Sequence, residues 1–495
     1  MRSTLTFFVF CIFISTFGQD RSISANETVS SNHQIAIKGK TVPYTAITGT
    51  QPVWNDEGKA IAAVHFTYYQ RSDIKNKAAR PLVISFNGGP GSASVWMHLA
   101  YTGPKILKVD DEGFPIQPYG VKDNPNSILD VADIVFVNPV NTGYSRILDT
   151  ENTDRDFFFG VNEDISYLAE WINTFVTRMN RWESPKYLIG ESYGTTRVSG
   201  LALELQNRQW MYLNGVILVS PTELGIHSGQ GRRDGPLGAA LRVPYFTAAA
   251  WYHEKLPSDL QSKDLLEVLD EVEKYAIQQL MPTLVKGGFV DEDERNKAAQ
   301  MISRYSGIST KSVLQYNLDV PTSFFWKELL REEGFTVGRL DSRYKGIDRT
   351  NGGDSPDFNS ELTSWLHAFT PAINYYYKNV LKYETDLKYN MFGPVHPWNR
   401  GNNNTGENLR QAMAQNPYLH TMIQSGYYDG ATKYFDAKYT LWQIDPSGKM
   451  KERLSFKGYR SGHMMYLRNE DLISSNDHLR DFIKKTLPGN KPAKY

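Results

Sequence analysis

Hydrophobic and polar positions change their periodicity along the chain, and the first clear pattern is strand-like. Residues 33–70 have the alternation of antiparallel strands. Within this stretch, Thr41–Thr48 and Ile61–Tyr69 are rich in β-branched and aromatic residues, and Asn55–Gly58 supplies a turn between them. The pattern predicts antiparallel strands near the start of the chain.

The next stretch, which ends at Pro221, alternates short apolar runs with helical stripes. Asp164–Val176 has its apolar residues at the spacing of one helical face. The apolar runs have the length of buried strands and lie at Pro81–Phe86, Ala132–Val137, Lys186–Ile189 and Gly215–Ser220. Strands that alternate with helices predict a mostly parallel sheet with helices on both faces.

Helical periodicity dominates from Pro221 to about residue 410. We expect one helix from Pro257 to about Leu280 and another over Asp291–Tyr305, whereas Asn399–Gly406 has the composition of an exposed loop. Strand and helix signals then resume at Leu419–Gln424, Ala431–Leu441, Leu454–Tyr459 and Asn476–Leu487. The sequence therefore predicts a core made of residues 19–221 and 411–495. Residues 222–410 are expected to form a helical cap insertion over the carboxyl ends of the strands.

The first 18 residues differ from the rest of the chain. Arg2 gives a positive start, Leu5–Phe17 is almost wholly apolar, and small residues such as Gly18 follow. A membrane-spanning helix needs about 20 apolar residues, so this run is short for an anchor. We expect residues 1–18 to be a signal peptide for export, with an uncleaved N-terminal anchor as the alternative, and no stable membrane insertion of the mature chain.

Composition and charge narrow the classes of function. The chain has 54 basic residues (Lys and Arg) and 54 acidic residues (Asp and Glu), so its formal net charge is zero. No overall positive field therefore favours binding to a nucleic acid. Cys11, inside the signal region, is the only cysteine. A mature chain without cysteine has no disulfides, no thiolate metal site and no cysteine nucleophile. Export without disulfides favours a bacterial envelope, periplasmic or secreted. The oligomeric state is left open.

Gly190-Glu191-Ser192-Tyr193-Gly194 is the most informative motif. It is G-x-S-x-G between an expected strand and an expected helix. On such an elbow a serine projects its hydroxyl above the sheet, and the flanking glycines avoid collisions with the strand and the helix. The motif predicts Ser192 as a nucleophile, with a glycine-flanked serine in an ordinary loop as the alternative.

An activated serine needs a general base, and the base needs an acid that orients it. Asp429 lies between Gly426 and Gly430 just after the Leu419–Gln424 strand, and His463 follows the next strand. The chain order Ser, Asp, His is the one that elbow-type sheets use. A capping aspartate and a solvated histidine are the alternatives for each residue alone.

A glycine-rich loop supplies the candidate oxyanion hole. Asn87-Gly88-Gly89-Pro90-Gly91-Ser92 directly follows the Pro81–Phe86 strand. We expect the N–H groups of Gly89 and Tyr193 to hold the oxyanion, because one donor normally comes from the residue after the nucleophile. A phosphate-binding loop is less favoured, since no Gly-Lys-Ser/Thr follows, and plain turn chemistry is the other alternative.

No metal or cofactor is required by these residues. His253-Glu254 resembles the start of a zinc-binding helix motif, but Pro257 stands where the second histidine would be. We therefore expect a reaction that depends on side chains and backbone alone.

Together these motifs resemble the serine carboxypeptidases, the family of carboxypeptidase C and cathepsin A. The resemblance covers about residues 60–222 and 416–487, and Asn138–Ser145 adds a further match before the elbow helix. It implies an α/β-hydrolase fold and removal of C-terminal residues from a peptide substrate. It also implies that Asn87 and Glu191 bind the terminal carboxylate of the substrate. Glu191 would then have to be protonated in order to donate a hydrogen bond, so we expect turnover to be better in mild acid than in alkali.

The chain also departs from the family pattern. A second acidic residue expected near Ala100 or Tyr101 is missing, and Tyr427 stands where aspartate usually follows glycine. The Asn138 segment has asparagine where the family often has aspartate and glycine, and the family's disulfides cannot form. These differences leave the serine chemistry intact but weaken the prediction of strict C-terminal specificity.

The predicted function is serine-type carboxypeptidase activity through Ser192, Asp429 and His463 with an acyl-enzyme intermediate. Two alternatives remain open at this point. One is a serine esterase, amidase or acyltransferase that uses the same residues on a substrate without a free carboxylate. The other is a binding protein that has kept the scaffold without catalysis.

Overall fold

The computed structural model describes residues 21–226, 235–401, 403–489 and 492. The predicted signal peptide, 1–18, lies outside these residues and stays a prediction. Within the described ranges, no helix is both long and apolar enough to cross a membrane.

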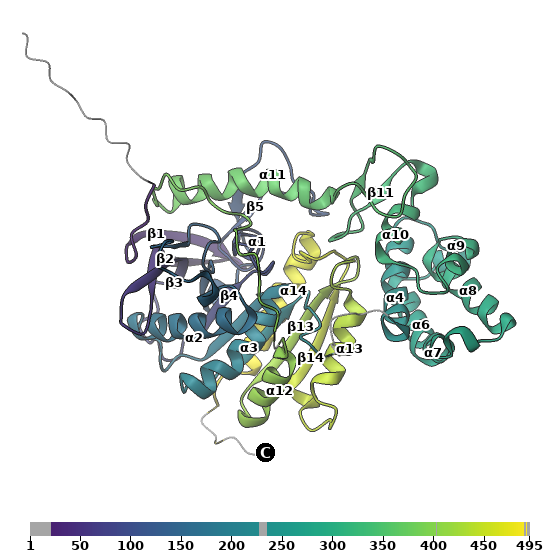
Figure 1. Cartoon of the computed structure of the whole chain (residues 1–495). Coiled ribbons are helices and arrows are strands. Elements are labelled where there is room, and N and C mark those ends of the chain that lie inside the picture. Colours follow the sequence, from purple (N-terminus) through teal and green to yellow (C-terminus); the bar gives the residue numbers. More distant parts are fainter. Residues whose placement is uncertain (1–20, 227–234, 402, 490–491, 493–495) are drawn as a thin grey trace, which may run out of the picture.

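A large mixed sheet forms the centre of the molecule (Figure 1). Its strands lie in the spatial order β1-β2-β3-β7-β4-β9-β10-β13-β14, and the short β8 (Arg146–Ile147) pairs with β3. Their bounds are β1 Thr28–Ile37, β2 Lys40–Trp54, β3 Ala60–Arg71, β4 Leu82–Phe86, β7 Asp133–Val137, β9 Lys186–Glu191, β10 Gly215–Val219, β13 His420–Gly426 and β14 Leu454–Tyr459.

The sheet has an antiparallel part and a parallel part. β1, β2 and β3 pair antiparallel, and β3 is antiparallel to β7. From β7 through β4, β9, β10, β13 and β14 every pairing is parallel. The predicted α/β-hydrolase-type architecture, with N-terminal antiparallel strands and a mostly parallel sheet, is therefore confirmed. The carboxyl ends of the parallel strands lie at one edge, where ligands bind in such folds.

Alternation along each parallel strand sends side chains to two separate apolar cores. In β9, Tyr187 and Ile189 belong to one core and Leu188 to the other. The Leu188 core contains α2 (Val161–Arg178), α3 (Tyr193–Arg208), α12 (Thr405–Gln415) and part of α13 (Tyr434–Ile444). The other core contains α1 (Val95–Ala100), α11 (Ser360–Tyr375) and α14 (Asn469–Lys485). Helices thus cover both faces, as predicted.

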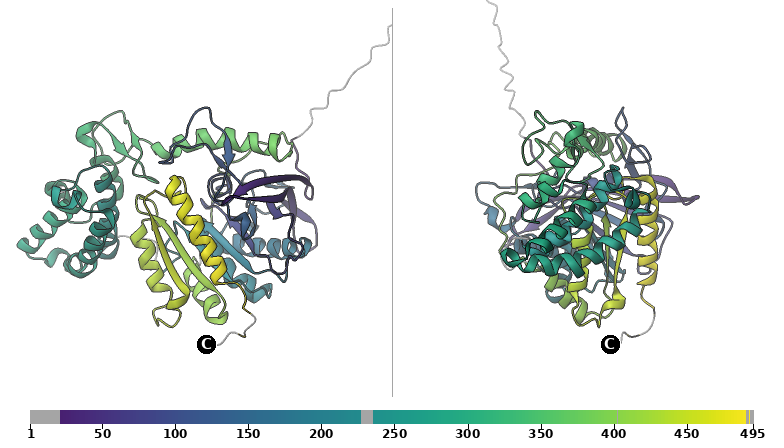
Figure 2. Two further views of the ribbon diagram at one scale, coloured as in Figure 1. Left: turned by 180° about the vertical axis from the view of Figure 1, so that it is seen from behind. Right: turned by 90° about the vertical axis from the view of Figure 1, so that its right-hand side faces the viewer.

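A group of helices forms a third apolar core beside the sheet (Figures 1 and 2). It consists of α4 Pro236–Tyr252, α5 Ser258–Gln261, α6 Leu265–Tyr275, α7 Met281–Val285, α8 Glu292–Ser306, α9 Thr310–Gln315 and α10 Thr322–Glu328. Tyr428, Tyr434 and Phe435 join this core from the sheet side. They attach the helical group next to the loop that carries Asp429.

The rest of the 222–410 stretch lies against the sheet. The short strands β11 (Thr336–Val337) and β12 (Lys345–Gly346) lead to α11, whose residues Trp365 and Phe369 are buried in a core shared with α1 and α14. Residues 222–410 therefore divide into an outlying helical group and a segment packed on the sheet. The predicted domain boundaries themselves stay a prediction.

Two predicted helices differ from the structure. The helix expected from Pro257 to Leu280 is broken, because Asp264 caps a new helix by accepting a hydrogen bond from the Leu266 N–H. The last helix was predicted to start at Asn476 but starts at Asn469. Its buried face includes Ser475 and Asn476, and these polar residues interrupt the apolar stripe.

Candidate active site

Ser192 occupies a sharp turn between β9 and α3. Its backbone has φ 57° and ψ −126°, a region that residues other than glycine rarely adopt. A Cβ on Gly190 would come within 2.2 Å of the Gly194 carbonyl oxygen, and one on Gly194 within 2.9 Å of the Phe86 carbonyl oxygen. Strand, turn and helix are therefore in direct backbone contact, which explains both glycines and leaves the serine at the apex.

Asp429 follows β13 and is fully buried. Its Oδ1 accepts hydrogen bonds from the N–H groups of Ala431 (2.8 Å) and Thr432 (3.0 Å). Its Oδ2 accepts one from the Thr432 hydroxyl (2.6 Å) and lies 2.6 Å from His463 Nδ1. These contacts fix the carboxylate in one orientation.

The loops that carry Asp429 and His463 touch each other. A Cβ on Gly426 would lie 2.0 Å from the Gly462 carbonyl oxygen, so only glycine fits there. Burial lowers the pKa of His463, but the Asp429 carboxylate outweighs this effect and raises the pKa above its ordinary value. With Nδ1–H donating to Asp429, the other ring nitrogen, Nε2, can accept a proton from a nucleophile.

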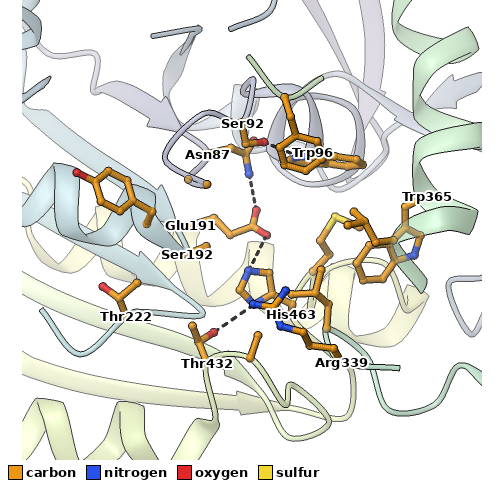
Figure 3. Close-up of a pocket in the computed structure, with 18 of the residues that line it drawn as sticks. Asn87, Ser92, Trp96, Glu191, Ser192, Thr222, Arg339, Trp365, Thr432 and His463 are labelled. Atoms are coloured by element: carbon orange, nitrogen blue, oxygen red, sulfur yellow. Dashed lines mark hydrogen bonds and ion pairs between the residues drawn. The ribbon is translucent and has the colours of Figure 1, made fainter. Parts of the chain in front are cut away.

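Ser192 and His463 line the same pocket (Figure 3). In the part of the chain that the structure describes, no hydrogen bond joins the Ser192 hydroxyl to the His463 ring, and Nε2 lies 4.0 Å from Glu191 Oε1. Hydrogen bonds of this kind are often long or absent without substrate and tighten in the reacting complex. The structure thus brings Ser192, Asp429 and His463 to one place.

The candidate oxyanion hole lies where the Asn87–Ser92 loop meets the elbow. A Cβ on Gly88 would come within 2.4 Å of the Tyr193 nitrogen. Both Gly89 and Tyr193 line the pocket, and within the described residues their N–H groups donate no backbone hydrogen bond. Such N–H groups are free to stabilise negative charge that develops beside Ser192.

Arg197 of α3 holds this loop from behind. Its guanidinium pairs with Asp164 (2.7 Å) and donates to the carbonyl oxygens of Asn87 (2.6 Å) and Pro90 (3.3 Å). Because the carbonyl oxygens of Asn87 and Pro90 accept hydrogen bonds from Arg197 on the helix side of the loop, they point away from the pocket. No sequence signal marks this contact, because Arg197 lies inside α3 past the end of the Gly190–Gly194 motif.

Glu191 and Asn87 are also brought together. Asn87 Nδ2 donates to Glu191 Oε2 (2.6 Å), and the Tyr466 hydroxyl donates to the same oxygen (2.5 Å). Burial raises the pKa of Glu191 to about 7, even though the charge of His463 and the hydrogen bonds from Tyr466 and Asn87 act in the opposite direction. In mild acid Glu191 is therefore mostly protonated and able to donate a hydrogen bond.

Tyr101 stands where the family pattern led us to expect an acidic residue. Its hydroxyl donates to Gln424 Oε1 (2.6 Å), and its ring stacks on Tyr466 with the ring centres 4.6 Å apart. Tyr466 in turn donates to Glu191. An aromatic stack thus supports Glu191 at this place. Tyr466 was missed from the sequence, although its position three residues after His463 is a usable signal.

The pocket has a volume of about 390 Å³ and receives residues from two sources (Figure 3). The carboxyl ends of the parallel strands and the residues that follow them supply Asn87, Gly88, Gly89, Glu191, Ser192, Tyr193, Thr222, Ala431, Thr432, His463 and Met464, and α1 with the residues before it supplies Ser92 and Trp96. Beyond Thr222, the 222–410 stretch supplies six more lining residues, Arg339, Leu340, Leu362, Trp365, Phe392 and Arg400. None of these six was named from the sequence.

Residues of the 222–410 stretch also hold the His463 loop in position. The Leu340 carbonyl accepts a hydrogen bond from the His463 N–H (2.7 Å), and the Leu340 N–H donates to Glu361 Oε1 at the start of α11 (2.8 Å). A Cβ on Gly462 would lie 2.5 Å from the Asp341 side chain. The His463 loop is therefore held between the sheet and the segment that precedes α11.

Comparison with known proteins agrees with this geometry. The serine carboxypeptidase family profile matches residues 47–305, about half of the chain. The matched region contains the oxyanion loop and the elbow and ends before Asp429 and His463. The roles of those two residues therefore depend on the geometry alone.

Individual relatives match over shorter spans. Serine carboxypeptidase-like 31 of Arabidopsis thaliana is 25% identical over 37% of this chain, and retinoid-inducible serine carboxypeptidase of Rattus norvegicus is 25% identical over 53%. These alignments span 36% and 53% of the relatives' own lengths. The crystal structure of Kex1(delta)p, a prohormone-processing carboxypeptidase from Saccharomyces cerevisiae, matches with a TM-score of 0.53 at 14% identity, covering 89% of this chain and 92% of that one. This last likeness shows the fold.

Proposed function

This chain belongs to the serine carboxypeptidase family, and we propose that it removes C-terminal residues from peptides by acyl transfer through Ser192. One observation carries the proposal. Asp429 Oδ2 lies 2.6 Å from Nδ1 of His463, and His463 lines the same pocket as the strained Ser192 elbow and as two N–H groups that bond to no backbone carbonyl of the described residues. Together these groups can serve as a nucleophile, a general base with its orienting acid, and an oxyanion hole.

The acylation step uses these groups in order. His463 Nε2 accepts the hydroxyl proton of Ser192 as Oγ forms a bond to the scissile carbonyl carbon. The Gly89 and Tyr193 N–H groups stabilise the resulting oxyanion, and Asp429 stabilises the imidazolium ring. The carbon–nitrogen bond then breaks, and His463 gives the proton to the leaving amine.

Deacylation repeats the sequence with water. His463 Nε2 takes a proton from water as the oxygen attacks the acyl-enzyme, the bond to Ser192 Oγ breaks, and Oγ regains its proton. The products are a shortened peptide and a free amino acid, and the enzyme returns to its starting state.

We propose that Asn87 and Glu191 bind the terminal carboxylate of the substrate. Protonated Glu191 can donate to a carboxylate, whereas the ionised form would repel it. Its pKa, raised to about 7 by burial, supports this role in mild acid. This pair would make the reaction specific for the last peptide bond.

A second candidate is an ester or amide substrate without a free carboxylate, or transfer to an acceptor other than water. The observation in its favour is that Tyr101, bonded to Gln424, occupies the place of the family's second acid. Equal rates on a peptide and on its C-terminally amidated form would favour this candidate over carboxypeptidase activity.

The proposed experiment uses N-blocked dipeptides with free C-termini. The full chain should release the C-terminal amino acid, and a folded Ser192→Ala variant should not. Release at the same rate by both proteins would contradict the proposal. Failure of a fluorophosphonate to label the protein would instead favour a binding protein.

We further propose that residues 222–410 act as a cap and that the chain is exported to a bacterial periplasm or secreted. The pocket residues that this stretch contributes, among them Arg339, Trp365 and Phe392, support the cap. Export is testable by fractionation and N-terminal sequencing, with a mature start just after Gly18 as the expected result. A start at Met1 in the cytoplasmic fraction would contradict export.

A further inference from the structure

Two arginines line the active-site pocket and make no ion pair with a described residue, although the charge of Arg339 acts on the buried Glu361 carboxyl, whose pKa burial raises to about 7. Arg339 and Arg400 are exposed, and among the described residues neither guanidinium makes an ion pair or a hydrogen bond. Other arginines near the site are engaged: Arg197 pairs with Asp164, and Arg343 pairs with Asp341 at 2.7 Å. Within the described ranges, the pocket therefore presents two guanidinium groups that no protein carboxylate pairs with.

The lining offers almost no negative charge to balance them. Among the described lining residues Glu191 is the sole acid, and its Oε2 already accepts hydrogen bonds from Asn87 and Tyr466. The Asp429 carboxylate is fully buried and bonded to His463. In mild acid, where Glu191 is mostly protonated, the pocket is net positive and attracts anions.

Arg339 lies on the His463 side of the pocket. Figure 3 shows its side chain beside His463, and its positive charge opposes the net rise that the Asp429 carboxylate causes in the pKa of that histidine. In the proposed reaction His463 protonates the leaving amine, so the residue that leaves lies next to His463. Arg400 lies near Tyr193 instead, where burial raises the pKa of the phenol and the charge of Arg400 acts against that rise. Arg339 is thus the cation nearer to the departing residue.

The walls next to Arg339 suit a side chain with an apolar stem and a charged end. Leu340, the next residue in the chain, lines the pocket together with Leu362, Trp365 and Met464, and Figure 3 shows Trp365 on the same side of the pocket as Arg339. Methylene groups can pack on such a wall, while a planar guanidinium binds a carboxylate through paired hydrogen bonds.

We propose that Arg339 selects substrates whose C-terminal residue is glutamate or aspartate, by binding the side-chain carboxylate of the residue that leaves. This inference rests on the proposed carboxypeptidase reaction. The terminal carboxylate remains with Asn87 and Glu191, so the substrate carries two anionic groups to two separate places.

The test separates recognition from turnover. Binding of N-blocked Phe-Glu and Phe-Gln is measured by calorimetry in mild acid, using full-length Ser192→Ala protein with and without Arg339→Gln. A charge-assisted contact predicts that Phe-Glu binds about 10- to 100-fold more tightly than Phe-Gln and that Arg339→Gln reduces this ratio to near one. Arg349→Gln is the matched control, because Arg349 is an exposed arginine of the same segment outside the pocket. It should leave the ratio unchanged.

Each contrary result has a clear meaning. An equal affinity for the two peptides, or a ratio that Arg339→Gln leaves unchanged, would overturn the inference. If Arg339→Gln weakened both peptides by one factor, Arg339 would bind the terminal carboxylate and not the side chain. Turnover of both peptides by the unaltered protein without a preference would overturn only the inference. A binding preference without turnover would overturn only the proposed reaction.

Discussion

The two sets of residues that meet in the pocket are held very differently. Asp429, at the end of a parallel strand, is buried and receives four polar contacts that fix its carboxylate. Arg339, which comes from the 222–410 stretch, is exposed and makes no ion pair with any described residue. The first arrangement suits a group that must be in position before substrate arrives. The second suits a group that takes its partner from the substrate.

This contrast predicts that residues at the strand ends carry out the reaction and that residues of the 222–410 stretch select the substrate. Changes at the strand ends should lower the rate with every substrate, because they alter groups used in each transition state. Changes in the 222–410 lining should alter affinity for particular substrates and leave the rate of the bound complex similar. The predictions below test this division.

The largest effect is expected from Ser192→Ala. Loss of the nucleophile should lower kcat about 10⁶-fold, because the remaining triad members have no oxygen to activate. Release of amino acid from a blocked dipeptide measures the effect. The melting temperature of the variant should be close to that of the unaltered protein, because alanine adopts the same strained backbone, with φ 57°, at that position. Retained activity would mean that Ser192 is not the nucleophile.

Asp429→Asn should lower kcat about 10⁴-fold with KM little changed. An amide cannot hold the Nδ1–H of His463 as the carboxylate does at 2.6 Å, so the ring would no longer present an unprotonated Nε2. Steady-state kinetics measure the effect. We expect a similar loss of kcat with every peptide. A loss confined to one class of peptide would contradict the division between strand-end residues, which act in the reaction, and the 222–410 lining, which selects substrates.

Glu191→Gln should change the pH profile. In the unaltered protein, kcat/KM on free peptides should fall about tenfold for each pH unit above the Glu191 pKa, which burial raises to about 7. The sign follows because the protonated form binds the carboxylate, and that form is lost as pH rises. The variant should lack this decline, and amidated peptides should lack it with either protein. An unchanged alkaline decline in the variant would refute the role of Glu191.

Phe392→Ala should have the smallest effect. Phe392 lines the pocket but is 49% exposed, so its loss should raise KM about fivefold with kcat unchanged. Phe289→Ala is the control, because Phe289 is 98% exposed and does not line the pocket. A drop in kcat for Phe392→Ala would mean that the 222–410 lining takes part in the chemistry.

The same contrast explains how far the sequence could be interpreted. β14 was predicted with its full bounds, and α8 (Glu292–Ser306) to within one residue, because its caps, Asp291 and Gly307, are visible in the sequence. The proposed nucleophile, base and acid follow strands in a fixed chain order, so local motifs sufficed to nominate them.

The lining from the 222–410 stretch offered no such signal. Arg339 and Trp365 reach the pocket only through the packing of β11, β12 and α11 against the sheet, and no short motif surrounds either residue. Tyr466 and Arg197 were missed for a related reason, since their partners are 275 and 33 residues away in sequence. Long-range packing decides these contacts, and a single sequence does not contain it in readable form.

Covalent labelling examines the nucleophile and its base together. The full chain is treated with a fluorophosphonate, and the modified peptide is identified by mass spectrometry beside a folded His463→Ala variant. We expect one adduct, on Ser192, that forms readily in the unaltered protein and very slowly in the variant, because His463 must take the serine proton. An adduct on another residue, or equal labelling of Ser192 without His463, would contradict the proposed relay.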